Sequence, residues 1–129
     1  MIVGLGMDLV DIARIERLLA EQGERAVKRL FTEAEAEYAR KRAHPARHFA
    51  ARFAAKEAAY KALAGTHEAR AVSWLDIEVA TEWDGRPTLV LHGRAAARAE
   101  ELGVVRALLT LTHSDAVAGA VVVLEGAGA

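Results

Sequence analysis

The sequence predicts a single α+β domain in which an antiparallel-rich sheet packs on a long central helix. The chain has 129 residues, of which 53% are apolar, and this suits one domain with a modest core. Helical patterns fill most of the first half of the chain, whereas strand patterns fill most of the second half. The last two strand patterns, at 104–112 and 117–124, are joined by a short turn, which predicts an antiparallel pair. Helices and strands segregated in this way are typical of the α+β class.

One strand and two capped helices are expected in the N-terminal part. Residues 2–9 are mostly apolar and are interrupted by glycines, which indicates a buried strand. Asp11 is suited to cap a helix that ends before Gly23. Thr32, with Glu35 three residues later, forms a capping-box pattern and predicts a second helix.

The central helix is expected over 45–64. Pro45 suits its first turn, and Gly65 is its expected C-terminal stop. One helical arc collects its large apolar residues, Phe49, Phe53, Tyr60 and Leu63. Lys56 projects near the middle of this arc, which is unusual for a solvated lysine. We interpret it as a lysine that snorkels out of the core, or that faces a cleft or another subunit.

The C-terminal half predicts strands with one more helix between them. Residues 75–79 alternate apolar and acidic side chains, as in a half-buried strand. A turn at 84–87 leads into a strand at 88–91. A short helix over 93–102 then precedes the final strand pair.

Composition bears on the domain extent, membrane association and cellular location of the protein. We expect one domain over 1–125 and a flexible tail over 126–129. No apolar run approaches the roughly 18 residues of a membrane helix, so no membrane association is expected. Cysteine is absent, which fits a cytoplasmic location.

Charge is distributed unevenly along the chain. Residues 12–56 hold 11 Lys/Arg against 6 Asp/Glu, whereas residues 57–129 hold 6 against 10. The stretch 40–56 contains bases and no acid. Such a block favours an anionic partner, although a solvated helix face would have the same pattern. The near-neutral total and the lack of interleaved aromatic residues argue against nucleic acid.

Asp8 and Glu57 are the carboxylates with a potential chemical role. Asp8 lies at the end of a buried strand, where it would serve either as a helix cap or as a ligand. Glu57 lies at the edge of the apolar arc with Lys61 one turn later, a spacing that also fits a surface ion pair. Two carboxylates with a substrate phosphate would suit Mg²⁺.

The glycine-rich strand Gly4–Asp8 and the run Arg52-Phe53-Ala54-Ala55-Lys56-Glu57-Ala58 together resemble the 4′-phosphopantetheinyl transferases. The closest resemblance is to the small trimeric type, the holo-acyl-carrier-protein synthases, and it covers nearly the whole chain. It implies transfer of phosphopantetheine from coenzyme A to a carrier-protein serine in fatty acid biosynthesis. Adenosine 3′,5′-bisphosphate would be the leaving group.

The resemblance also implies roles for individual residues. Asp8, Glu57 and Lys61 would be catalytic, with the two carboxylates holding Mg²⁺ beside the coenzyme A pyrophosphate. The coenzyme would be bound by Arg52, Lys56, Lys61, Gly65 and His113. The loop after Gly65 has fewer glycines than is usual in the family, and Thr110 stands where serine is common.

Two partners besides the coenzyme are implied by the resemblance. The acyl carrier protein would dock on Arg14, Arg17 and Arg25. The chain would form a homotrimer with the active sites between neighbouring subunits.

Two other functions are consistent with the same residues. A metal-dependent phosphoesterase would use both carboxylates on a nucleotide without a protein acceptor. A trimeric binding module would dock acidic helical proteins through residues 12–56 and would not need the carboxylates.

Overall fold

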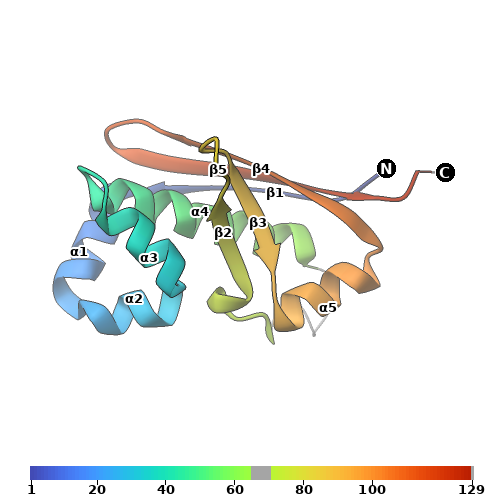
Figure 1. The fold of residues 1–129 in the computed structure, drawn as a ribbon, viewed down its shortest axis with the longest axis horizontal. Helices are drawn as coiled ribbons and strands as arrows, with labels where there is room; N and C mark the ends of the chain where they lie inside the picture. The colour runs from blue at the N-terminus through green and yellow to red at the C-terminus, as the bar shows by residue number, and fades with distance from the viewer. Residues whose placement is uncertain (65–70, 129) are drawn as a thin grey trace.

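The computed structural model describes residues 1–64 and 71–128, with most helices in the first half of the chain and most strands in the second. The elements are β1 (Ile2–Asp11), α1 (Ile12–Gln22), α2 (Glu24–Leu30), α3 (Glu33–Arg40), α4 (Pro45–Leu63), the 3₁₀ turn η2 (Trp74–Asp76), β2 (Ile77–Thr81), β3 (Pro87–Leu91), α5 (Gly93–Glu101), β4 (Val104–His113) and β5 (Val117–Gly126). The sheet β1-β5-β4 lies along one side of α4, and the other helices lie on the opposite side (Figure 1). The predicted fold class is confirmed.

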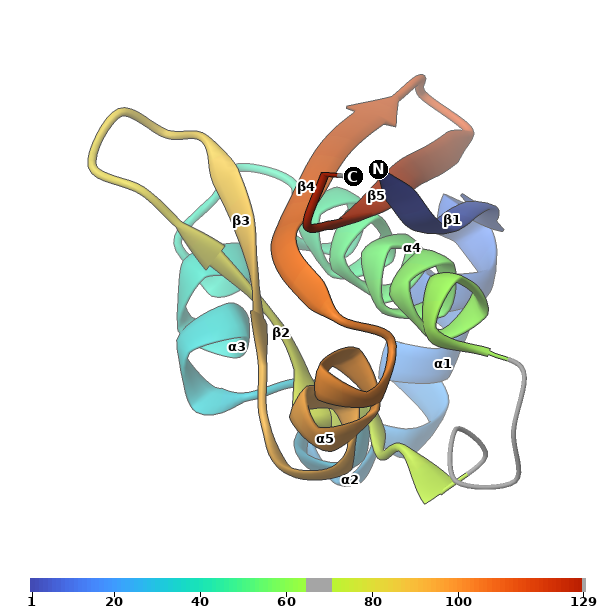
Figure 2. The ribbon, with the colours of Figure 1, turned by 90° about the vertical axis from the view of Figure 1, so that its right-hand side faces the viewer.

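The strands form two antiparallel sheets, whereas the sequence pattern predicted one. The larger sheet has the order β1-β5-β4, and β2 and β3 pair with each other as a separate hairpin. This hairpin flanks α4 on the side of α3, and its tip projects away from the body of the molecule (Figure 2). Apolar alternation identifies a strand but does not identify its partner.

Helix α4 is buried on nearly all sides, and two glycines of β1 make this possible. A side chain at Gly6 would place its Cβ 1.8 Å from the carbonyl oxygen of Ala58, and one at Gly4 would meet Ala62 O at 2.4 Å. The strand therefore packs directly on the alanine-rich surface of the helix. The buried surface of α4 is consequently wider than the single apolar arc that the sequence predicted.

The predicted N-terminal caps of the helices can be compared with the structure. The capping box of α3 is confirmed, because Glu35 N donates to Thr32 Oγ1 at 3.2 Å and Thr32 N donates to Glu35 Oε1 at 2.9 Å. Asp11 takes the N-cap position of α1, but its side chain makes no capping hydrogen bond. Helix α2 was not predicted, because it has only seven residues and follows α1 with Gly23 alone between them.

Two expected boundaries were wrong. Leu75 lies in the η2 turn rather than in a strand, because the Ser73 side chain caps that turn and β2 begins at Ile77. Gly126 belongs to β5 rather than to a flexible tail, and its N–H donates to Met1 O at 2.7 Å. No helix in residues 1–64 and 71–128 is long and apolar enough to span a bilayer.

Candidate active site

Asp8, Glu57 and Lys61 come together where β1 crosses the C-terminal half of α4. Lys61 Nζ donates to Asp8 Oδ1 at 2.9 Å and to Met7 O at 3.0 Å. Asp8 is therefore held by α4, and it does not cap a helix. The close packing of β1 on the helix, which the glycines permit, determines this contact. These three residues, called here the carboxylate cluster, were predicted as catalytic, and the structure brings them together.

The electrostatics of Glu57 differ from those of a surface glutamate. Burial raises the pKa of Glu57, and the negative charge of Asp8 raises it further, whereas Lys61 and Arg14 act in the opposite direction. Two neighbouring carboxylates repel each other and are stabilised by a cation placed between them. Among the described residues, no group of three or more His, Cys, Asp or Glu side chains is arranged to hold a metal.

A cleft of about 480 Å³ opens beside Glu57, between α1 and α4. Phe53, Trp74 and two leucines form its apolar part, and arginines surround it. Its lining residues are Arg14, Arg17, Leu18, Glu21, Arg29, Leu30, Phe53, Glu57 and Trp74. Two of the three predicted docking residues, Arg14 and Arg17, therefore share a surface with the carboxylate cluster. Arg25 is exposed on α2 outside this arginine cleft, and Arg29 takes part in its place.

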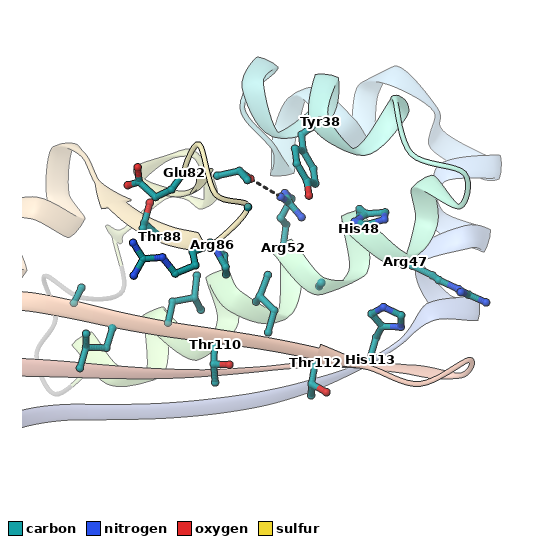
Figure 3. A pocket seen from close by; sticks show the side chains of 18 residues that line it. Tyr38, Arg47, His48, Arg52, Glu82, Arg86, Thr88, Thr110, Thr112 and His113 are labelled. Carbon is teal, nitrogen blue, oxygen red and sulfur yellow. Dashed lines mark hydrogen bonds between the residues drawn. The ribbon is translucent and has the colours of Figure 1, made fainter.

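A second cavity, of about 610 Å³, lies between the N-terminal half of α4, the β2–β3 hairpin and β4 (Figure 3). Arg52 and His113, both predicted to bind the coenzyme, line this cationic cavity together with Arg47, His48 and Arg86. None of its lining residues also lines the arginine cleft. Within one chain, the structure therefore does not bring Arg52 and His113 to the carboxylate cluster.

Arg52 is the most constrained residue of the cationic cavity. It is only 3% exposed, and its Nη2 donates to Thr81 Oγ1 at 3.2 Å. Its guanidinium also lies 4.0 Å from the ring centroid of Tyr38. Its buried Nε has no hydrogen-bond partner among the described residues. A buried donor without a partner, inside a cationic cavity, favours an anionic ligand.

The positive potential of this cavity acts on His48. Burial lowers the pKa of His48, and the charges of Arg52, Arg42, His113 and Arg47 lower it further. A histidine in such a field stays neutral at physiological pH. The cavity therefore combines fixed guanidinium charges with the imidazole of His48, whose charged form is disfavoured.

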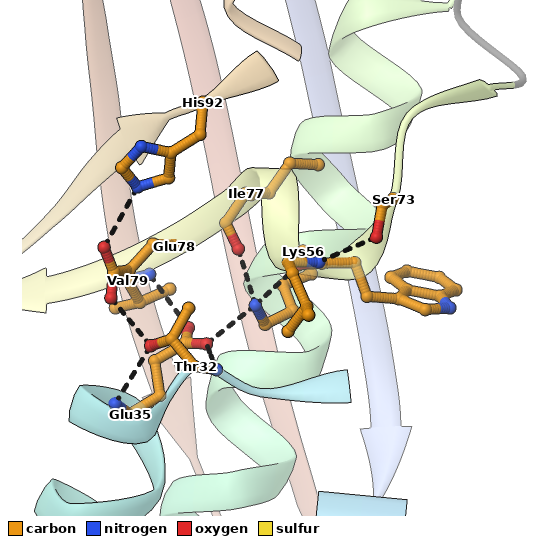
Figure 4. Close-up of polar contacts among 10 residues, drawn as sticks. Thr32, Glu35, Lys56, Ser73, Ile77, Glu78, Val79 and His92 are labelled. Carbon is orange, nitrogen blue, oxygen red and sulfur yellow. Dashed lines mark hydrogen bonds and ion pairs between the residues drawn. The ribbon is translucent and has the colours of Figure 1, made fainter. Parts of the chain in front are cut away.

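The interpretation of Lys56 as a snorkelling or cleft-facing lysine is wrong. Its side chain is fully buried, and its ammonium contacts Glu35 Oε1 at 2.7 Å, Trp74 O at 2.8 Å and Ile77 O at 2.5 Å (Figure 4). An ammonium has three donors, so none remains for a coenzyme phosphate. Lys56 lies on the apolar arc because its ammonium is buried in an ion pair with Glu35. Gly65 lies outside the described residues.

Sequence reasoning missed several residues of the cationic cavity. Tyr38, Arg86 and Thr88 line it but come from α3 and the β2–β3 hairpin. Arg47 belongs to the acid-free stretch 40–56, and that stretch was the one signal that pointed to this region. The hairpin residues carried no such signal, because their approach to α4 depends on the tertiary fold.

Comparison with known proteins gives consistent matches over almost the entire chain. Residues 4–121 match the family model of the 4′-phosphopantetheinyl transferase superfamily. The chain is 53% identical to the holo-[acyl-carrier-protein] synthase of Anaeromyxobacter dehalogenans, over 99% of both sequences. The fold matches the crystal structure of holo-[acyl-carrier-protein] synthase from Neisseria meningitidis, with a TM-score of 0.84 and 30% identity, over 97% of this chain and 99% of that one.

A third match comes with a bound nucleotide. The holo-(acyl-carrier-protein) synthase of Bacillus anthracis was solved in complex with CoA (3′,5′-ADP). It is 36% identical to this chain, with a TM-score of 0.78, over 98% of this chain and 99% of that one.

Proposed function

The chain belongs to the 4′-phosphopantetheinyl transferase superfamily, and we propose that it transfers 4′-phosphopantetheine from coenzyme A to a serine of apo acyl carrier protein. In this reaction the serine oxygen forms a bond to the phosphorus that carries pantetheine. The bond from that phosphorus to the bridging pyrophosphate oxygen breaks, and adenosine 3′,5′-bisphosphate leaves. The observation that carries the proposal is the carboxylate cluster at the end of an arginine-lined cleft, in a chain similar to known synthases along its whole length.

Mg²⁺ fits the carboxylate cluster as part of this proposal. Asp8 and Glu57 offer hard oxygen donors, and Mg²⁺ is usually held by one or two carboxylates together with substrate phosphates and waters. The raised pKa of Glu57 is consistent with this role, because a cation would relieve the repulsion from Asp8. When bound, the ion would neutralise charge on the pyrophosphate oxygens.

The side chains of this protein supply the remaining functions that the reaction requires. The half-exposed ammonium of Lys61 orients Asp8 and is available to a phosphate oxygen. The arginine cleft presents Arg14 and Arg17 to an acidic helical carrier, with its serine directed toward Glu57. Positioning of the two reactants supplies a large part of the rate enhancement in such transfers.

A homotrimer with sites between subunits is the second part of the proposal. The cationic cavity suits the nucleotide phosphates, yet it shares no lining residue with the arginine cleft of the same chain. A neighbouring subunit would supply the cationic cavity beside the carboxylate cluster. The outer face of the large sheet supports association, because Leu5, Met7 and Leu9 are each 59–65% exposed there.

The last part of the proposal is a cytoplasmic location and a role in fatty acid biosynthesis. The sequence contains no cysteine, which suits the reducing cytoplasm. Modification of an acyl carrier protein would place the enzyme in fatty acid biosynthesis.

One measurement of intact mass tests the proposed reaction. Apo acyl carrier protein is incubated with coenzyme A, Mg²⁺ and this protein, and the carrier should gain one phosphopantetheine group. Coenzyme A without the carrier is the control. Release of adenosine 3′,5′-bisphosphate in that control would indicate a phosphoesterase if the carrier in the complete reaction also stays unmodified. Binding of the carrier without any product would indicate a docking module.

A further inference from the structure

Lys56 and Glu35 form a buried ion pair at the point where several distant segments meet (Figure 4). Lys56 is 0% exposed and Glu35 is 1% exposed. Glu35 also accepts hydrogen bonds from Thr32 N and from Val79 N, each at 2.9 Å. The pair therefore joins α4 to the start of α3 and to β2.

The other two hydrogen bonds of Lys56 fix the η2 turn on α4. Its ammonium donates to Trp74 O and to Ile77 O, at the two ends of that turn. A 3₁₀ turn of three residues leaves most of its carbonyl groups without partners in the turn. Lys56 satisfies one of them, Trp74 O, and also the first carbonyl of β2, Ile77 O, and so determines where Trp74 is placed.

The Trp74 side chain, called here the Trp74 wall, lines two neighbouring spaces beside Glu57. Its ring lies 5.2 Å from the ring of Phe53, measured between centroids. It lines the arginine cleft, and it also lines a smaller hollow of about 370 Å³ that includes Tyr60 and Ser73. Glu57 lines both spaces as well. The position of Trp74 therefore sets the shape of the surface next to the carboxylate cluster.

We propose that Lys56 and Glu35 are positioning residues, which hold the Trp74 wall in the geometry that carrier docking needs. This inference rests on the proposed function of the arginine cleft. A buried ion pair is often no more stabilising than apolar residues of similar size. What it provides here is a set of directional bonds at fixed positions, which an apolar side chain does not supply.

Loss of the pair therefore has a specific kinetic consequence. Lys56→Met removes the bonds to Trp74 O and Ile77 O, so the Trp74 wall is no longer held on α4. The KM for the carrier rises by roughly tenfold, because an error of position in a docking surface is costly. The KM for coenzyme A stays near the wild-type value, because the cationic cavity contains none of these residues.

The test uses tryptophan emission together with kinetics. The chain has two tryptophans, and Trp83 is 95% exposed at the tip of the hairpin. A Trp83→Phe background therefore leaves Trp74 as the only tryptophan, which is excited selectively over the two tyrosines. In this background, Lys56→Met shifts the Trp74 emission to the red and raises the carrier KM. Unchanged emission with unchanged carrier KM would overturn the proposal.

A second variant separates positioning from stability. Glu35→Gln combined with Lys56→Met removes the carboxylate charge that Lys56→Met leaves buried without a counter-ion. The double variant removes a buried charge that has lost its counter-ion, although Thr32 N and Val79 N still donate to residue 35. It regains thermal stability relative to Lys56→Met, but its carrier KM and Trp74 emission stay altered, because the carbonyls of Trp74 and Ile77 remain without their donor. Recovery of KM and emission in parallel with the melting temperature would mean that the pair is only structural, and would overturn the proposal.

A third variant covers the case in which the Lys56 variants do not fold. Trp74→Ala removes the half-buried wall directly and leaves the ion pair intact. It raises the carrier KM to a similar extent, and an unchanged KM would overturn the proposal. If the wild-type protein transfers nothing to any carrier, the proposed function fails. The emission comparison needs no substrate, so it still decides whether Lys56 holds Trp74.

Discussion

Lys61 Nζ lies 2.9 Å from Asp8 Oδ1, so an ion pair joins the last turn of the central helix to the first strand. The two residues are 53 positions apart in the sequence. The Asp8 side chain is 18% exposed and that of Lys61 is 52% exposed, which leaves the ammonium accessible to a substrate phosphate. The pair orients Asp8 beside Glu57, and this arrangement carries the predictions for the chemical step.

The carboxylate variants test the metal-binding role of the cluster. Asp8→Asn and Glu57→Gln preserve size but remove the ligand charge. Each should lower kcat by two or more orders of magnitude, about 3 kcal/mol or more of transition-state stabilisation. The circular dichroism spectrum should not change. Glu100→Gln, at an exposed position on α5, is the matched control and should retain wild-type activity. Near-normal rates for both cluster variants at saturating Mg²⁺ would contradict the proposed site.

The raised pKa of Glu57 predicts a pH-dependent effect on stability. Between the ordinary glutamate pKa of 4.5 and the raised value, the folded state keeps a proton that the unfolded chain has lost. The stability contribution of Glu57 is therefore complete below the ordinary pKa and is lost as the pH rises through the folded pKa. Glu57→Gln should accordingly raise the melting temperature near pH 7 and have little effect near pH 4. Calorimetry at both pH values checks this, and a destabilised variant near pH 7 would show that the charge of Glu57 is stabilising.

A charge placed on the outer face of the large sheet tests whether the protein is a trimer. Met7→Glu places a charge among the exposed apolar side chains of β1, at a position that is 59% exposed in one chain. If this face is buried between subunits, the variant should dissociate in light scattering and lose activity. Val90→Glu, on the hairpin and 38% exposed, is the control and should stay trimeric. A wild-type protein that is a fully active monomer at assay concentration would refute the trimer.

Mixed trimers test whether the active site lies between subunits. Asp8→Asn and His113→Ala should each be inactive alone, because one lacks the carboxylate cluster and the other lacks part of the cationic cavity. When the two are co-assembled in equal amounts, about a quarter of the intersubunit sites combine an intact cluster with an intact cavity. Activity should therefore return in the mixture. If the mixture stays inactive although subunit exchange is demonstrated, each chain contains its own complete site.

The sequence predicted the elements well where the determining residues are close together. The Thr32–Glu35 box and Pro45 lie at the starts of their helices, and their effects are local. Asp8 and Glu57 were identified through the family resemblance, but their contact depends on Gly4 and Gly6 packing on α4. The spacing of residues along the chain does not contain that information.

Lys56 shows why the remaining errors arose. Its place on an apolar arc was recognised as unusual, yet the meaning of that position depends on Glu35 and on the carbonyls of Trp74 and Ile77, which other segments supply. A buried lysine with three acceptors and a lysine that faces a cleft have the same helical pattern. Arg52 and His113 were both predicted to bind the coenzyme, and both line the cationic cavity. That cavity depends on the hairpin, whose placement no sequence pattern predicts.

The arginine cleft predicts how the carrier docks. Arg14 and Arg17 line the cleft beside Glu57, whereas Arg25 is exposed outside it. Charges at the rim of an interface act mainly on the association rate and on its salt dependence. Arg14→Glu should therefore raise the KM for an acidic carrier several-fold and flatten its dependence on ionic strength. The KM for coenzyme A should change less, because Arg14 does not line the cationic cavity to which the nucleotide is assigned.

Arg25→Glu is the matched control, because it makes the same charge change outside the cleft. Arg25 does not line the cleft, so a docking site confined to the cleft residues predicts a smaller effect for Arg25→Glu than for Arg14→Glu. Steady-state kinetics at two salt concentrations measure both. Equal effects of the two variants on the carrier KM would extend the docking surface onto α2. Equal losses for carrier and coenzyme in Arg14→Glu would contradict a role of Arg14 that is confined to carrier docking.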